Sequence, residues 1–236
     1  MPVLRRLARF VGLALVALLV VVASAVAVRF ATAPPSPSLP PGFSVAPDAE
    51  ASDPVLRAEL LRRSALDQAV RHAADLGALS DVASVGGLWG VAGEAIRLER
   101  VDRPNRRWVR ETVAAGGWPT SAEVGRDGLE ALFTLVQHAD LELQQAALPP
   151  FRAAWQRGAL DGEQLALLTD RVLMGEGRPQ RYGSQLRATP GTGMALYPID
   201  DAAAVDARRA AMGMVPLAEY LDLACRETGA CVDLPS

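Results

Sequence analysis

The sequence has no lysine, two histidines, two cysteines and few aromatic residues, which make up 5% of the chain. Neither histidine belongs to an HxxxH or HExxH pair, and neither cysteine has a further ligand at zinc-site spacing. No GxSxG string marks a nucleophile elbow. We therefore expect no metal and no cofactor, and the scarcity of aromatic residues argues against a large aromatic binding surface.

All 24 basic residues are arginines, which we attribute to a coding bias and not to nucleic-acid binding. Four of them flank the first hydrophobic segment. The other 20 share the rest of the chain with all 27 acidic residues, so the net formal charge there is −7. An acidic domain is poorly suited to bind DNA or anionic lipid. We expect no nucleic-acid partner, and any other ligand or protein partner stays open.

The first 28 residues predict a membrane anchor. Residues 10–28 read FVGLALVALLVVVASAVAV and hold no charge. A helix of this segment is long enough to cross the hydrocarbon core of a bilayer. Arginines in the tail 1–9 favour a cytoplasmic N-terminus. We therefore expect a single-pass protein of the cell membrane, with its N-terminus inside and its domain held outside the cytoplasm.

A cleaved signal peptide is the alternative, because two strings have the small-x-small form of a cleavage site, one near the end of the apolar segment at 25–27 and one after it at 31–33. The apolar core is longer than that of most signal peptides, which favours the uncleaved anchor. In both cases the domain is exported. Residues 29–49 are rich in proline, which predicts an extended spacer before a folded domain at 50–236.

Helical periodicity and capping residues dominate residues 50–236, so we expect an all-α fold, mainly a helical orthogonal bundle with one long irregular polar loop. A glycine-rich stretch at 78–95 predicts an irregular segment, and Pro149-Pro150 predicts a kink or a break. The polar region 178–200 predicts a loop or a short hairpin. The expected helices cover 53–76, 104–115, 127–139, 141–157, 161–174, 202–212 and 216–227.

His138 is the strongest candidate for catalysis. It ends an apolar helix in the string LVQHAD, and an imidazole titrates near neutral pH, where it acts as a general base or a ligand. Asp140 and Asp170 are candidate catalytic partners, provided that the fold places them next to His138. The alternative is that His138 stabilises the dipole at the end of its helix.

A second candidate site follows the helix expected at 161–174. Neutral donors and acceptors gather there, and this composition favours an amide, a sugar or a peptide backbone over phosphate. The alternative is that these groups satisfy the backbone of their own loop. The candidate binding residues are Gln137, Arg171, Gln180, Tyr182 and Gln185.

Cys225 and Cys231 are six residues apart near the C-terminus. In an oxidising compartment this spacing favours a small disulfide that would fasten the chain end. Two free thiols are the alternative.

Four strings in this order, GGWPTSAEVGRDG, LVQHAD, LTDRVLMGEGRPQRYGSQ and PIDDAAAVDARRAAMGMVPLAEYL, resemble the bacterial family called domain of unknown function 6624. The resemblance covers residues 55–222. It implies an exported domain without an established activity. It also implies importance for the residues that match its motifs: Trp118, Pro119, Gln137, His138, Asp140, Asp170, Arg171, Gln180, Tyr182, Gly183 and Gln185.

Three functions remain open. The anchor, the spacer and the neutral polar residues favour a binding or interaction module of the cell envelope. The alternative is a hydrolase or transferase with His138 as general base and Asp140 or Asp170 as its aid. The third is a scaffold whose function lies on another surface.

Overall fold

A computed structural model describes residues 39–46, 48, 50–72, 85–189, 194–228 and 231–232. The predicted tail 1–9, anchor 10–28 and first part of the linker 29–49 lie outside these residues. No helix among the described residues is long and apolar enough to cross a membrane. The chain divides into two compact units, Met1–Pro37 with Ala73–Arg100 and Ser38–His72 with Val101–Ser236. Of the first unit, only 85–100 is described.

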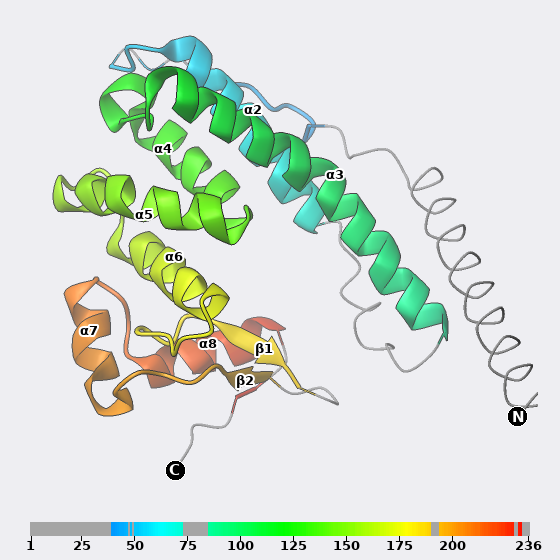
Figure 1. Cartoon of the computed structure of the whole chain (residues 1–236), viewed down its shortest axis with the longest axis vertical. Coiled ribbons are helices and arrows are strands. Elements are labelled where there is room, and N and C mark those ends of the chain that lie inside the picture. Colours follow the sequence, from blue (N-terminus) through cyan, green and yellow to red (C-terminus); the bar gives the residue numbers. More distant parts are fainter. Residues whose placement is uncertain are drawn as a thin grey trace, which may run out of the picture. The chain divides into compact units, whose positions relative to one another are not determined.

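The described residues are mostly helical, which confirms the predicted helical class (Figure 1). One small sheet of two strands is present. The elements follow in the order α2 (Pro54–His72), α3 (Val85–Gly116), α4 (Ser121–Gln137), α5 (Leu141–Gln156), α6 (Gly162–Gly175), β1 (Leu186–Ala188), β2 (Met194–Leu196), the 3-10 helix η2 (Ala202–Ala204), α7 (Val205–Ala211) and α8 (Leu217–Thr228).

α2 begins as its sequence predicts. The side chain of Asp53 accepts a hydrogen bond from the Leu56 amide at 2.9 Å, which caps the helix. Leu60 and Val70 are buried on its apolar side. The helix packs on α4, and the amides of Ser52 and Asp53 bond to the start of α4.

α3 corrects the prediction for residues 85–116, whereas residues 78–84 of the predicted irregular stretch lie outside the described residues. The helix expected at 104–115, with Asp102 as its cap, already begins at Val85, and Pro104 lies inside it. The glycine-rich residues from Val85 to 95 are therefore helical instead of irregular. Glycine costs a helix only about 1 kcal/mol per residue, so the helical residues around it decide the outcome.

α4 is longer than predicted, because it begins at Ser121. Thr120 and Glu123 form a capping box at this end, with Glu123 bonded to the Thr120 amide at 2.8 Å. Gly125 interrupts the helical backbone with a φ of 71°. A side chain at this position would start 2.5 Å from an Asp48 oxygen, so glycine is required there.

Pro149 and Pro150 do not break the helix, because α5 is one element from Leu141 to Gln156; the alternative prediction, a kink, stays a prediction. The prolines deprive the carbonyls of Gln145 and Ala146 of their helical donors. Both of these residues are exposed, so water reaches the carbonyls. Ala147 and Phe151 are buried on either side of the pair and hold both halves of the helix in the core.

α6 is capped by Asp161, which forms a capping box with Gln164. The polar region after it contains a short antiparallel hairpin, with Leu186 opposite Leu196. Of the two predicted alternatives, a loop or a short hairpin, the short hairpin is confirmed.

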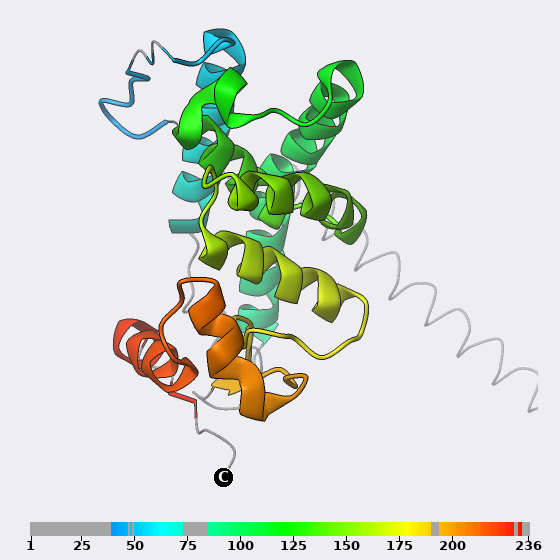
Figure 2. The ribbon, with the colours of Figure 1, turned by 90° about the vertical axis from the view of Figure 1, so that its left-hand side faces the viewer.

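The main core lies among α2, α4, α5 and α6, and its large buried side chains include Leu60, Leu132, Phe151 and Leu168. In both views of the ribbon, α4, α5 and α6 follow one another down the second unit, with α7 and α8 beyond α6 (Figures 1 and 2). A smaller cluster, Val205, Leu217 and Leu221, joins α7 to α8. Most candidate site residues lie at the ends of these helices or in the loop after α6.

Candidate functional site

His138 lies directly after α4, and its ring is paired with a buried carboxylate from the end of α2. The distance between His138 Nδ1 and Asp67 Oδ2 is 2.8 Å. Asp67 is 1% exposed, and the His138 side chain is 14% exposed. His138 Nε2 has no hydrogen-bond partner within the described residues. If Nδ1 carries the proton, which this geometry favours, Nε2 is left as a free base.

Arg71 joins Asp67 to a second carboxylate. Its Nε lies 3.2 Å from Asp67 Oδ2, and its Nη2 lies 2.7 Å from Asp102 Oδ1. Burial by itself raises the pKa of Asp67, but the hydrogen bonds and charges of His138 and Arg71 outweigh it and hold that pKa below its usual value. Burial dominates at Asp102 and raises its pKa. Asp67 is thus the charged partner of His138.

Arg171, on α6, is a partly buried cation near this group. Its Nε is buried without a hydrogen-bond partner, and no carboxylate in the described part of the chain pairs with it. Burial, and then the charge of Arg71, lower the pKa of Arg171. An unpaired cation costs folding free energy, so its position favours the binding of an anion. We name Asp67, Arg71, Asp102, His138 and Arg171 the histidine cluster.

Asp140, a predicted catalytic residue, has different partners. Its Oδ1 accepts from the Leu143 amide at 3.2 Å and caps α5. The same oxygen accepts from Arg110 at 2.6 Å. No hydrogen bond joins Asp140 to His138 among the described residues, so the structure does not bring these two together.

Asp170, the other predicted catalytic partner, is fully buried and holds the loop after α6. Its carboxylate accepts from the amides of Arg181 at 2.7 Å, Tyr182 at 3.1 Å and Ser184 at 3.0 Å. The Ser184 hydroxyl donates to it at 2.9 Å. Every hydrogen bond described for Asp170 goes to this loop and none to His138, so its geometry is that of a structural staple.

Gln180 has a similar role. It is fully buried, and its side chain donates to the carbonyls of Gln185 at 3.2 Å and Tyr197 at 2.9 Å. Its oxygen accepts from the Gln185 amide at 2.9 Å. The Gln185 side chain donates to Ser184, whereas the Gln137 side chain makes no hydrogen bond within the described residues. These bonds match the alternative in which the polar groups satisfy their own loop.

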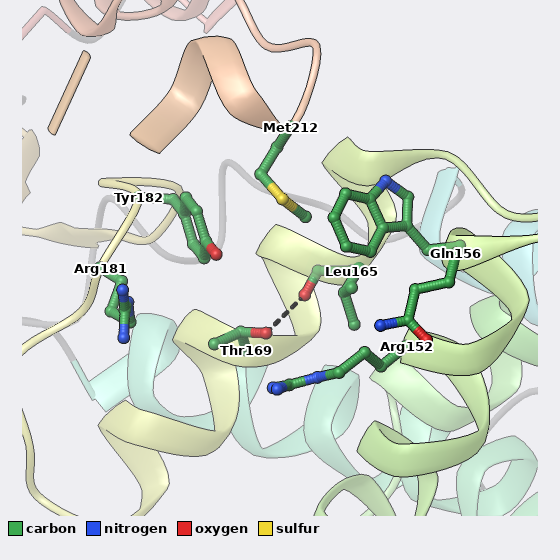
Figure 3. A pocket seen from close by; sticks show the side chains of 8 residues that line it. Arg152, Gln156, Leu165, Thr169, Arg181, Tyr182 and Met212 are labelled. Carbon is green, nitrogen blue, oxygen red and sulfur yellow. Dashed lines mark hydrogen bonds between the residues drawn. The ribbon is translucent and has the colours of Figure 1, made fainter. Parts of the chain in front are cut away.

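Tyr182 differs from these residues because it lines a pocket of about 290 Å³. The pocket lies between the end of α5, one face of α6 and the loop after it (Figure 3). Arg152 and Arg181 also line it. We name it the loop pocket. The Tyr182 backbone is fixed by Asp170 on one side and by a bond of 2.7 Å from Arg209 on the other.

The sequence-based search missed Asp67, Arg71 and Asp102. A signal for Asp67 was present, because it lies seven residues after Leu60 and three before Val70, on the apolar side of α2. A carboxylate at such a position needs a buried partner. The partner itself, 71 residues away, could not be read from local spacing.

Cys225 and Cys231 are joined by a disulfide. No group of three or more histidine, cysteine, aspartate or glutamate side chains is arranged to hold a metal ion in the ranges that the structure describes.

Comparison with known proteins gives a family but no activity. A search of curated proteins and a search of solved structures found no match. The model of one protein family, described as a family of unknown function, matches residues 54–232. This match contains α2, α4, α6 and every residue of the histidine cluster. It covers well over half of the chain, which therefore belongs to the family of unknown function DUF6624.

Proposed function

We propose that the domain is an enzyme, a hydrolase or transferase that uses His138 as its general base. The observation that carries this proposal is the bond of 2.8 Å between His138 Nδ1 and the buried Asp67. A carboxylate on Nδ1 holds the ring in one orientation and stabilises the imidazolium that forms when Nε2 takes a proton. The same pair would serve either a bound hydroxyl group or a water molecule as nucleophile.

Burial and charge around the pair support this role. Asp67 is held in its charged form by Arg71 and His138, so it is ready to stabilise a protonated ring. Arg171 supplies a positive charge that no carboxylate of the described residues pairs with, which favours a substrate with an anionic group. Asp140 and Asp170 are left with the structural roles described above.

The test uses the full chain and a panel of chromogenic esters, phosphate esters and glycosides. We expect turnover of one class, with loss of activity in His138→Gln. Asp67→Asn should reduce kcat by about 10²–10⁴-fold, because the ring loses its preferred tautomer. His72→Gln is the matched control, since His72 is exposed and its ring bonds to the Gln68 carbonyl of its own helix. Turnover that persists in His138→Gln would contradict the proposal.

The location of the domain belongs to the same proposal. Residues 10–28 would anchor the chain in the membrane, and the spacer would place the domain outside the cytoplasm. Alkaline phosphatase, which is active only after export, reports on this if it is fused after residue 49. We expect an active fusion that sediments with membranes. An inactive fusion would contradict the location outside the cytoplasm. A fusion found in the soluble fraction would contradict the membrane anchor.

A binding module of the cell envelope is the second candidate function. The loop pocket favours it, because this cavity is lined by a predicted binding residue, Tyr182, and lies against a loop fixed by buried hydrogen bonds. A binding module predicts that a ligand binds without turnover and that His138→Gln leaves its affinity unchanged.

A further inference from the structure

The loop pocket is separate from the histidine cluster. Leu165 and Thr169, which are four residues apart, line it from one face of α6. Arg171 is two residues after Thr169, which places it about 200° around the helix from this face. The pocket and the cluster therefore use different sides of α6.

Two arginines line the pocket. Arg152 comes from α5 and Arg181 from the loop after α6, and Thr169 lies between them in Figure 3. Neither guanidinium group has an ion pair within the described residues. Some other arginines of this acidic domain do have carboxylate partners, as Arg110 has Asp140 and Arg126 has Asp161, each at 2.6 Å.

The other lining groups are apolar or neutral. Leu165 and the rings of Trp155 and Tyr182 offer apolar surface. The Thr169 hydroxyl donates to the Leu165 carbonyl at 2.7 Å, so its oxygen remains free to accept a hydrogen bond (Figure 3). The pocket thus combines positive charge, aromatic surface and a hydroxyl acceptor.

We propose that the loop pocket binds a small sugar that carries one oxyanion, a carboxylate or a phosphate. The two guanidinium groups bind the oxyanion, because their paired N–H donors match its geometry. Trp155 and Tyr182 contact the apolar face of the sugar ring, and Thr169 accepts from a ring hydroxyl. The volume of about 290 Å³ suits a ligand of one sugar unit.

The buried bonds around the pocket explain why the loop is fixed so firmly. Asp170 binds the amides of Arg181 and Tyr182, and Arg209 binds the Tyr182 carbonyl. A loop that is already ordered loses little conformational entropy when a ligand binds. Asp170 thereby acts as a positioning residue for the pocket.

This inference supplies a ligand class for the second candidate function, and it does not require catalysis at His138. His138→Gln should therefore keep the affinity of the loop pocket. Retained binding together with absent turnover would reject the enzyme and leave the pocket intact. Turnover without sugar binding would reject the sugar site in the loop pocket and leave the proposed enzyme intact.

The test is calorimetric titration of the full chain in detergent with four probes: glucuronate, glucose 6-phosphate, glucose and phenylacetate. We expect one or both anionic sugars to bind, and the pair distinguishes a carboxylate from a phosphate. Glucose lacks the charge and phenylacetate lacks the ring hydroxyls, so both should bind at least about tenfold more weakly. If neither anionic sugar binds more tightly than glucose and phenylacetate, the proposal is overturned.

Variants locate the site. Arg152→Gln and Arg181→Gln should each weaken the binding of the anionic sugar by about tenfold, because each removes one charge-assisted contact. Arg157→Gln is the matched control, since Arg157 is exposed at the end of α5 but does not line the loop pocket. An affinity that survives in the double variant Arg152→Gln, Arg181→Gln would overturn the assignment to this pocket.

Discussion

Two buried carboxylates of this domain differ in what surrounds them. Asp170 is 0% exposed and accepts from three backbone amides and one hydroxyl of a single loop. Asp67 is 1% exposed and accepts from His138 and Arg71, which are side chains that carry or take up protons. Backbone donors make a carboxylate a fixed part of the fold, whereas ionisable donors make it part of a chemical site.

Replacement of Asp170 should have the largest effect on stability. Asp170→Ala leaves three loop amides without the buried acceptor that orders the loop, so we expect a loss of about 3–5 kcal/mol in the free energy of unfolding. Urea denaturation measures this loss. Asp200→Asn, at an exposed position, is the control and should stay within about 0.5 kcal/mol of wild type. A loss below that limit for Asp170→Ala would remove the distinction between the two carboxylates.

Asp67→Asn should cost less, about 1–3 kcal/mol near pH 7, because one charged partner of His138 and Arg71 becomes neutral. The folded-state pKa of Asp67 is depressed, so its contribution is present above the ordinary value of 3.8 and is lost as pH falls below it. Denaturation of both proteins should therefore show a difference near pH 7 that shrinks toward about pH 3. A difference that grows on acidification would contradict this assignment.

Arg171→Met should change stability in the opposite direction. The variant removes a partly buried cation for which the described residues offer no carboxylate partner, and it keeps a side chain of similar length. We expect a gain of about 1–2 kcal/mol, as for other sites where function costs stability. Thermal melting measures the shift, and Arg126→Met, which removes an exposed ion pair, is the control. A clear loss in Arg171→Met would mean that the cation is structurally satisfied.

Asp140→Ala should have the smallest effect, about 1 kcal/mol, because it removes an N-cap and an exposed ion pair. Enzymatic turnover, once a substrate is found, should keep its pH profile in this variant. A change in that profile would return Asp140 to the catalytic site.

Local signals predicted the helices well where capping residues and apolar spacing agree, as at Asp53 and Asp161. They failed near Pro104, where α3 begins earlier than predicted, and at Pro149, which does not break α5 because the carbonyls that lose their donors belong to exposed residues. His138 was found from its own chemistry. Its partner Asp67 was not, because their contact depends on how α2 packs on α4, and a sequence without aligned relatives does not report that packing.

The central claim is that Asp67 holds His138 as the Nδ1–H tautomer with Nε2 free, and nitrogen NMR of the histidine rings tests it most directly. The chain has two histidines, so His72 is an internal comparison. We predict Nδ1–H for neutral His138 in the wild type and a shift toward Nε2–H in Asp67→Asn, with His72 unchanged. An Nε2–H tautomer in the wild type, or no response to Asp67→Asn, would contradict the account.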